Sequence, residues 1–478
     1  MKIPAYLGRE IIGTRGINNT WKYSLDKEIN IDLSRLEHFG IFARSGGGKS
    51  YAMGDLAEES IIHKNNFATL IIDPLGNFTT MKIKNTTDEV EIWNKNLNRN
   101  ELKPTALNDR IRILIPKESI PFIDESMYDG VFGLNADSLT DDLFCYAFGM
   151  QTSDLQPSLL RKTKRFLDKA GTPYTLSDIS IEIRNQEAHP QTIDALANKL
   201  DILYSLGLIT NNAPEIYDIL KPNTTTILNL SMSSSYTNKI IVNFLAKQLI
   251  KYRSIISSKI NLAKIKLEQE EEQWRQYNNW YQAPTRIIID EAHEFIPGNS
   301  TLKKLIKKGR NLGIVVGVVS QSADLSKTVY ANMTHLFVGQ MRFNEDINLL
   351  RNLTSTDLTP DEFKKIIKRQ GNGNFVYFNL NKDTYKEMKF RPRLTLHPAS
   401  NQVQDEKKYL IIGKGDKKDI NEIFQSIIDI IGKKPYNISD LPKEYHKFLI
   451  EMERHGYIVR NNDSIMWSLK KVKIGVEG

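Results

Sequence analysis

The sequence predicts an α/β protein with a parallel central sheet that is covered by helices, and two observations support this fold class. First, several short apolar runs do not alternate with polar residues, as expected for strands that are buried on both faces. These runs are “FATLIID” (67–73), “RIIID” (286–290), “LGIVVGVVS” (312–320) and “HLFVGQM” (335–341). Second, segments with helical periodicity separate the runs, so strands and helices alternate along the chain as they do in parallel sheets.

The core begins with a strand, a loop, a helix and a second strand. “HFGIFA” (38–43) is a compact apolar run that ends in a glycine-rich loop. After this loop, Met53, Leu56, Ala57 and Ile61 recur at threes and fours, which is the spacing of one helix face. The apolar run 67–73 follows, so the segment is predicted to be a βαβ unit.

The remaining chain divides into segments of different composition. The first residues hold short apolar stretches broken by Gly and Asn, and they are predicted to be rich in strands. A central insertion has helical periodicity throughout, except for the strand-like run “IRILIP” (111–116). The predicted segments are a strand-rich N-terminal segment (1–36), the α/β core (37–82 and 220–397, with a long helix over 237–262), the mostly helical insertion (83–219) and a polar linker (398–408).

The last segment, residues 409–478, has its own pattern. “INEIFQSIIDII” is an amphipathic helix, and a second helical region follows it. “YIVRNNDSIMWSL” reads as two short strands around Asn-Asn-Asp, which is a hairpin pattern. Helices followed by a hairpin suggest a winged-helix module, and a small α+β cap without a role in DNA binding is the alternative.

Composition and charge exclude several classes of protein. No apolar run approaches the roughly 18–20 residues of a membrane-spanning helix, and the first residues lack the apolar region of a signal peptide. Cys145 is the single cysteine, which excludes an internal disulfide and a cysteine-based zinc site. These features predict a cytoplasmic protein without an integral membrane segment. The 65 Lys and Arg residues against 57 Asp and Glu give a net charge of +8, which is compatible with a polyanionic partner.

The glycine-rich loop “ARSGGGKSY” (43–51) predicts a site for ATP and Mg²⁺. Glycines let backbone N–H groups approach phosphate oxygens at the start of a helix. Lys49 would reach the β- and γ-phosphates, and the hydroxyl of Ser50 would be a ligand of Mg²⁺. Ala43 stands where such loops usually begin with glycine, and its methyl group is a small addition. The residues predicted to bind the nucleotide are Ser45, Gly46, Gly47, Gly48, Lys49, Ser50 and Tyr51.

An acidic pair at the end of a buried strand predicts the second half of this site. In “RIIIDEAHEF” (286–295), Asp290 would hold Mg²⁺, and Glu291 would orient and deprotonate the attacking water. An acid cluster at a helix N-terminus is the alternative interpretation of this pair. His293 is interpreted as a structural residue, and no H-E-x-x-H pattern indicates a zinc site.

Further polar residues flank the next buried strand. Gln321 follows it, at the edge of a parallel sheet where ligands bind, and is expected to sense the γ-phosphate or position water; an ordinary strand cap is the alternative. Arg310 precedes the same strand and is a candidate arginine finger for the ATP of a neighbouring subunit. Two basic clusters could face a polyanion or could be solvated helix faces. They are Lys303, Lys304, Lys307 and Lys308, and, in the insertion, Arg161, Lys162, Lys164 and Arg165.

The order and style of these motifs resemble those of the HerA/FtsK superfamily, and in particular its HerA branch. The resemblance covers residues 28–82 and 220–397, and it rests on “HFGIFARSGGGKS”, “LIIDPLGNF”, “IIIDEAHEFIP”, “KKGRNLGIVVGVVSQ” and “RPRLTLH”. Members of this family form hexameric rings with RecA-like cores, hydrolyse ATP between subunits and pump double-stranded DNA through the central pore. The resemblance therefore implies a RecA-like P-loop NTPase core and a homohexamer that acts on duplex DNA.

The same resemblance implies roles for single residues. Lys49 and Ser50 match the loop of the family, and Asp290 and Glu291 match its acidic pair. Gln321 matches the glutamine that follows the next strand of the family. Arg310 matches the arginine of the family that is proposed to act in trans.

Two positions and one segment depart from the pattern of this family. Ala43 replaces the first glycine of the loop, and Asn77, in “DPLGNF”, stands where relatives usually carry an acid. Residues 1–36 are too few for the N-terminal β-barrel of full HerA proteins, which helps to build the ring and to bind partner nucleases. The resemblance therefore implies a member without the usual barrel, with a nuclease or another protein as its partner, in a mobile-element, viral or conjugation setting.

Three functions remain open from the sequence. The first is an ATP-driven motor that moves double-stranded DNA in DNA processing, packaging or transfer. The second is an ATPase similar to those of type IV secretion, which acts on protein substrates or pilus assembly. The third is a DNA-binding scaffold of low activity, against which the intact Lys49, Asp290 and Glu291 argue. A metabolic kinase is disfavoured, because a glutamate directly after Asp290 suits activation of water better.

Overall fold

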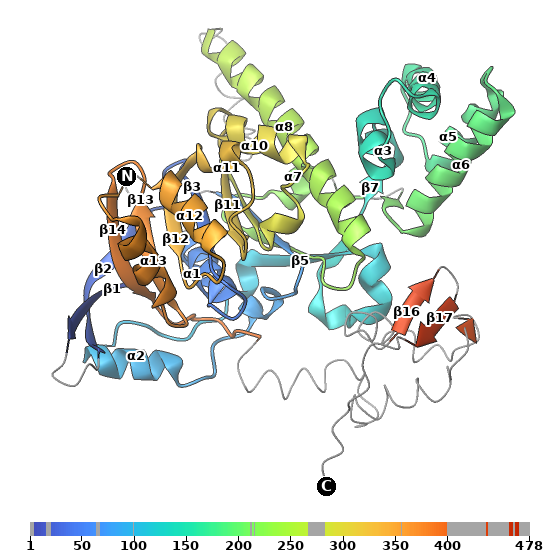
Figure 1. Cartoon of the computed structure of the whole chain (residues 1–478). Helices are drawn as coiled ribbons and strands as arrows, with labels where there is room; N and C mark the ends of the chain where they lie inside the picture. Colours follow the sequence, from blue (N-terminus) through green and yellow to red (C-terminus); the bar gives the residue numbers. More distant parts are fainter. Residues whose placement is uncertain are drawn as a thin grey trace.

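The computed structural model describes residues 4–398, apart from 16–20, 64–66, 99, 211–212, 215, 266–282 and 355, together with three short strands after residue 435. Its centre is a large sheet (Figure 1). The strands of this sheet are β1 (Pro4–Arg15), β2 (Trp21–Asp32), β3 (His38–Phe42), β4 (Ala68–Asp73), β5 (Ile111–Pro116), β6 (Gly130–Phe132), β9 (Thr225–Asn229), β10 (Thr285–Ile289), β11 (Ile314–Ser320), β12 (Met333–Val338), β13 (Asn374–Asn379) and β14 (Thr384–Phe390).

The middle of the sheet is parallel, which confirms the predicted fold class. Its strand order is β2-β1-β14-β13-β12-β3-β11-β10-β4-β9-β5-β6, and every neighbouring pair from β12 to β6 is parallel. All residues of β3, β4, β9, β10, β11 and β12 are buried. The apolar runs lack alternation because both faces of these strands are covered.

The sheet extends beyond the predicted core at both edges. At one edge, β13, β14, β1 and β2 continue it with antiparallel pairs, so the strands of residues 1–36 join the sheet through β14. At the other edge, β5 pairs in parallel with β9, and β6 pairs in parallel with β5. The segment 83–219 thus supplies two strands of the central sheet as well as helices, and β5 is the strand expected at 111–116.

Helices cover both faces of the sheet and form a separate group at one side (Figure 1). The helix α1 packs on one face, where its apolar side chains meet those of β3, β4, β10 and β11. The helices α8, α10, α12 and α13 pack on the other face. The helices are α1 (Lys49–Ile62), α2 (Glu89–Leu97), α3 (Asp141–Phe148), α4 (Leu155–Lys169), α5 (Leu176–Asn185), α6 (Pro190–Ser205), α7 (Ile216–Ile219), α8 (Ser235–Ile265), α10 (Ser300–Gly309), α11 (Lys327–Tyr330), α12 (Asn344–Leu353) and α13 (Pro360–Lys368).

The helices α3 to α6 form the helical part of the predicted insertion. They pack on one another through buried side chains such as Leu160, Ile179, Leu196 and Leu200, and these are continuous with the core of the sheet. The strands β7 (Leu134–Asn135) and β8 (Ile209–Thr210) pair in parallel where the chain enters and leaves this group. The pairing of β7 with β8 thus holds the two ends of this group together.

The C-terminal hairpin agrees with its prediction. The strands β16 (Ile458–Asn461) and β17 (Ser464–Trp467) are antiparallel, and β15 (Tyr436–Asn437) pairs with β17. The linker beyond residue 398 and the predicted helices of this module lie outside the described residues. The winged-helix module therefore stays a prediction. Among the described residues, every helix is too short or too polar to cross a membrane.

A buried cluster of charges ties α1 to the chain that follows β14. The guanidinium of Arg391 donates to Glu58 and to Glu59, each at 2.9 Å, and its Nη1 lies 3.3 Å from Asp55. Glu58 also accepts from the backbone of the following segment, including the N–H of Thr395 at 2.8 Å. Burial raises the pKa of Asp55 well above its usual range. Burial would also raise the pKa of Glu58, but the charges of Arg391 and Arg393 hold it below its usual value.

Replacing Arg391 with methionine is expected to lower the free energy of unfolding by about 3–5 kcal/mol, because it leaves buried carboxylates without their cation. The midpoint of urea unfolding would measure the change. Lys382→Met is the matched control, because this lysine lies in the exposed turn between β13 and β14, and it should change stability by less than about 0.5 kcal/mol. Equal midpoints for the two variants would contradict a stabilising role for the cluster.

Candidate nucleotide-binding site

The glycine-rich loop joins β3 to α1 at the carboxyl end of β3, in the middle of the parallel sheet. Gly46 and Gly48 have φ values of 72° and 92°, in the left-handed region that glycine adopts without strain. A Cβ atom at Gly48 would lie 3.0 Å from the backbone nitrogen of Gly373, so a larger residue would also press on the loop before β13. The sequence did not indicate this neighbour, because Gly373 lies far from the loop in the chain.

The start of α1 presents backbone donors to the loop. Ala52 donates its N–H to the carbonyl of Gly48 at 2.9 Å, which is the first bond of the helical ladder. The N–H groups of Lys49, Ser50 and Tyr51 precede this bond, and the first N–H groups of a helix have no acceptor within the helix. They form an anion-binding helix start of the kind that the loop motif predicts.

The side chain of Tyr51 points to other partners. Its hydroxyl donates to Glu89 at 2.7 Å and accepts from the N–H of Arg393 at 2.9 Å. Tyr51 can therefore contribute to the predicted site through its backbone, while its side chain binds α1 to the start of α2 and to the chain after β14.

Ala43 fits into the fold where glycine was expected. Its side chain is fully buried. Its methyl group faces two glycines, since a Cβ at Gly47 or at Gly339 would lie 3.0 or 2.9 Å from it. The space that the alanine needs is thus provided by glycines on the loop itself and after β12, and the loop keeps its course.

Lys49 lies folded over the loop and faces the acidic pair. Its side chain is buried, and Nζ donates to the carbonyl of Arg44 at 3.4 Å. Burial lowers the pKa of Lys49, while the charges of Glu291 and Asp290 act in the opposite direction. The loop lysine and the two acids are therefore electrostatic neighbours, as the motifs predicted.

Asp290 and Glu291 follow β10, the strand next to β4 and β11. Burial raises the pKa of Asp290 to about 8, and the charges of Glu291 and Asp73 add to this shift. Its Oδ2 is buried and has no hydrogen-bond partner among the described residues. A buried oxygen without a donor fits a cation, which would favour the ionised carboxylate, so Asp290 and Ser50 suit the predicted Mg²⁺.

Glu291 adopts an unusual backbone conformation. Its φ is 47°, in the left-handed region, and its N–H donates to Oδ1 of Asp290 at 3.0 Å. A short 3₁₀ helix (Ala292–Glu294) begins directly after it. Strained backbone of this kind occurs at functional sites, where it fixes the direction of a side chain.

Asn77 contacts Ser50, one of the two residues that are predicted to bind Mg²⁺. The buried carboxylate of Asp73 accepts from the N–H groups of Asn77 and Phe78, both at 2.9 Å, and so folds the loop after β4. In this fold the amide of Asn77 lies 3.3 Å from the hydroxyl oxygen of Ser50. The sequence identified Asn77 only as a departure from the pattern of relatives, and the structure places it at the site.

Gln321 follows β11 at the same edge of the sheet. His293, which was interpreted from the sequence as a structural residue, lies between Gln321 and Glu291. The amide nitrogen of Gln321 lies 3.2 Å from Nε2 of His293. The other ring nitrogen, Nδ1, lies 3.3 Å from Oε2 of Glu291. Spacing could not reveal this arrangement, because it depends on β10 and β11 being neighbours.

Arg310 lies at the opposite end of β11. Its Nη2 donates to the carbonyl of Asn332 at 2.7 Å and to the hydroxyl of Thr334 at 2.9 Å. It also lies near His38, at the start of β3, where burial lowers the pKa of the imidazole to about 4 and Arg310 adds to the shift. At about 3.3 Å per residue, β11 separates Arg310 from Gln321 by roughly 20 Å. The structure therefore does not bring Arg310 to the loop of its own chain.

The two basic clusters differ in their surroundings. On α10, Lys304, Lys307 and Lys308 are exposed beside Arg310. In the insertion, by contrast, two of the four basic residues have structural partners. Arg161 pairs with Asp141, and the buried Lys164 donates to the carbonyls of Ala136 and Asp137. The cluster in the insertion thus has mainly the structural role that the sequence left as an alternative.

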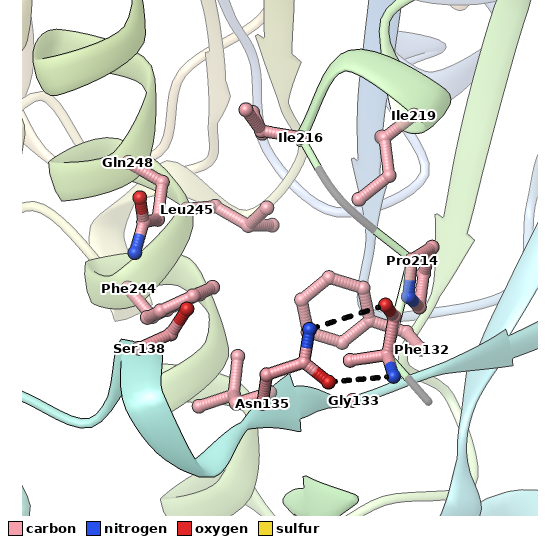
Figure 2. Close-up of a pocket in the computed structure, with 12 residues that line it drawn as sticks. Phe132, Gly133, Asn135, Ser138, Pro214, Ile216, Ile219, Phe244, Leu245 and Gln248 are labelled. Atoms are coloured by element: carbon pink, nitrogen blue, oxygen red, sulfur yellow. Dashed lines mark hydrogen bonds between the residues drawn. The ribbon is translucent and has the colours of Figure 1, made fainter. Parts of the chain in front are cut away.

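A separate hollow lies between β7 and α8 (Figure 2). It is lined mainly by apolar side chains, among them Phe132, Ile216 and Phe244, and it encloses about 20 Å³. Asn135 closes one side, because its amide exchanges two hydrogen bonds with the backbone of Ala213. This space is enough for about one water molecule, so the hollow is a feature of packing and not a second site.

Comparison with known proteins identified one family and several distant structures. Residues 22–249 match the model of the family described as “Helicase HerA, central domain”. No curated protein is similar to the chain at a significant level.

Three solved structures illustrate the range of similarity. VirB4 of Thermoanaerobacter pseudethanolicus is 12% identical, with 84% of this chain and 97% of that chain covered and a TM-score of 0.46. The plasmid coupling protein TrwB in complex with ADP and Mg²⁺ is 13% identical, with 82% and 98% covered and a TM-score of 0.46. The genome packaging NTPase B204 from Sulfolobus turreted icosahedral virus 2, in complex with ATP-gammaS, is 12% identical, with 74% and 97% covered and a TM-score of 0.31.

Proposed function

With a HerA central domain at residues 22–249, the chain belongs to the HerA/FtsK P-loop ATPases, and we propose that it is a motor that moves double-stranded DNA. The proposal has three parts, which are hydrolysis at the edge of the parallel sheet, assembly that completes this site with a second copy, and binding of duplex DNA. The observation that carries it is the convergence of Lys49, Asp290 and Glu291 at one edge of the sheet.

The loop and α1 would bind the phosphates of ATP. The N–H groups at the start of α1 and the ammonium of Lys49 would hold phosphate oxygens. Ser50 and Asp290 are the residues that would hold Mg²⁺, which neutralises charge on the β- and γ-phosphates when it is bound. The backbone of Gly373, packed against Gly48, would keep the loop in this conformation.

Glu291 would act on the attacking water. Its backbone is in the left-handed region, and its side chain is 12% exposed, so it keeps contact with the space in front of the strand ends. A carboxylate at that position can orient a water molecule and accept its proton during attack on the γ-phosphate. Gln321, at the end of the neighbouring strand, would sense the γ-phosphate.

Arg310 supports assembly into a ring. It lies at the far end of β11 from the loop of its own chain, where Asn332 and Thr334 hold its guanidinium. An arginine finger supplied by the adjacent subunit stabilises the charge of the transition state. Head-to-tail contacts between copies close into a ring when the rotation between neighbours permits it, and we infer a homohexamer.

Duplex DNA is the proposed substrate because the chain is basic and because the exposed lysines of α10 make no ion pair within the part of the chain that the structure describes. The net charge is +8, and Lys304, Lys307 and Lys308 project from α10. Contacts between lysines and phosphates supply affinity that does not depend on sequence, which a translocating motor requires.

The test is steady-state ATP hydrolysis by the full chain with Mg²⁺, with and without linear double-stranded DNA. We expect duplex DNA to raise kcat several-fold, and the stimulation to weaken steeply between about 50 and 200 mM salt, as for ligands that contact many phosphates. Hydrolysis that requires Glu291 but ignores DNA would contradict the DNA motor and favour an ATPase that acts on proteins.

A further inference from the structure

Three polar side chains from two neighbouring strands meet in front of the sheet. Glu291 follows β10 and Gln321 follows β11, which are parallel neighbours. His293 lies between their side chains, with Nε2 3.2 Å from the Gln321 amide nitrogen and Nδ1 3.3 Å from Oε2 of Glu291. The imidazole thus contacts Gln321 through Nε2 and Glu291 through Nδ1, and Nδ1 also lies 3.4 Å from the hydroxyl oxygen of Ser320.

The chemistry of the partners fixes the direction of these contacts. A carboxylate only accepts hydrogen bonds, so the nitrogen beside Glu291, Nδ1, must carry a proton to interact favourably. In a neutral imidazole Nε2 is then an acceptor, and the amide nitrogen of Gln321 is a donor. All three groups therefore suit a single chain of donors that runs from Gln321 through His293 to Glu291.

The contact to Glu291 is adjustable. Oε2 of Glu291 is buried and makes no hydrogen bond among the described residues, although Nδ1 of His293 lies 3.3 Å from it. A small rotation of either side chain would convert this contact into a hydrogen bond. The contact between Oε2 of Glu291 and Nδ1 of His293 therefore depends on the position of the imidazole.

The far end of the chain of contacts is attached to other elements. Beside Gln321, the hydroxyl of Ser320 donates to the carbonyl of Ser322 at 2.6 Å. The next residue, Ala323, donates its N–H to Asp346, in the first turn of α12, at 2.7 Å. Movement of Gln321 would therefore also displace the loop between β11 and α11, and through this loop α12.

We propose that His293 is a positioning residue that couples Glu291 to Gln321, so that the orientation of the hydrolytic carboxylate depends on Gln321. This inference rests on the proposed function, because it assumes that Glu291 acts on water. His293 contacts neither phosphate nor water in this scheme. It acts through the two residues beside it, and removing it should reduce the rate of hydrolysis without weakening the binding of ATP.

The test compares three substitutions of His293 in the full chain. Asn retains a donor near Nδ1, Gln places its amide near Nε2, and Ala retains neither. For His293→Ala we expect kcat to fall about tenfold with KM for ATP unchanged, as for other residues that orient a functional group. His293→Asn should recover part of this loss, because its amide still donates toward Glu291. His189→Ala, at an exposed position before α6, is the matched control and should leave kcat unchanged.

A double-mutant cycle tests the coupling itself. If His293 acts through Gln321, His293→Ala combined with Gln321→Ala should lower kcat no further than the more harmful single substitution. Losses that multiply would overturn the coupling. Thermal unfolding of each variant ensures that the rates refer to folded protein.

The outcomes separate this inference from the proposed function. An inactive Glu291→Gln variant together with a fully active His293→Ala variant would overturn the role of His293 and leave the proposed function intact. A fully active Glu291→Gln variant would overturn the proposed function, and the role of His293 would fall with it.

Discussion

Replacing Glu291 with glutamine is expected to lower kcat for ATP hydrolysis by about 10²–10⁴, the range that removal of a general base produces. The amide has nearly the same shape but cannot accept the proton of the attacking water. The residues that would bind the phosphates and Mg²⁺, among them Lys49 and Ser50, are unchanged, so the affinity for ATP should be retained. Single-turnover hydrolysis and equilibrium binding of a fluorescent ATP analogue would measure the two effects separately.

The matched control is Glu294→Gln. Glu294 lies three residues further along the chain, at the end of the same 3₁₀ helix, and is exposed. The Glu294→Gln substitution removes one negative charge from the same region, so a general electrostatic effect would appear in both variants. A Glu294→Gln variant with normal kcat would assign the loss to the carboxylate of Glu291. Comparable losses in both would contradict its role as the base.

Replacing Arg310 with alanine is expected to lower kcat by about 10³–10⁵, the range for an arginine finger. The decisive experiment is a mixture. In a random assembly of equal amounts of Arg310→Ala and Glu291→Gln chains, about a quarter of the head-to-tail interfaces would pair an intact Glu291 with an intact Arg310. Such a mixture should recover activity, although each variant alone is inactive.

A role within the same chain would give the opposite result. If Arg310 served its own loop, every chain of the mixture would still lack one essential residue, and activity would stay absent. Lys308→Ala provides the control for loss of a positive charge on α10, because Lys308 is exposed two residues before Arg310. A mixture without recovery, from chains that co-assemble by size-exclusion chromatography, would exclude a finger that acts between subunits.

The fold class could be predicted because burial on both faces leaves a direct trace in the sequence. The runs that became β4, β10 and β11 are mostly apolar and do not alternate with polar residues, and every position of these strands is buried, as expected inside a covered parallel sheet. The edges of the sheet left no such trace. β6 has three residues, and β14 has exposed positions, so their membership is decided by pairing with distant strands.

The residues of the candidate site likewise divide into those that the sequence could identify and those that only the fold brings together. Lys49, Ser50, Asp290 and Glu291 could be named in advance, because each belongs to a short motif whose spacing reflects local geometry. His293 and Gly373 could not be assigned to the site. The contacts of His293 need β10 beside β11, and the contact of Gly373 needs the loop before β13 beside α1. Asn77 lies between these cases, since its position was noted but its contact with Ser50 was not foreseen.

The buried cluster around Arg391 has a consequence for how the sequence can evolve. Asp55, Glu58 and Glu59 face Arg391 and Arg393 in the interior, and burial raises the pKa of Asp55 well above its usual range. Replacing Glu58, Glu59, Arg391 or Arg393 alone with a neutral residue leaves an unbalanced charge in the interior. Drift along this lineage should therefore pass through paired replacements, and descendants should either keep the whole set or change an acid and an arginine together.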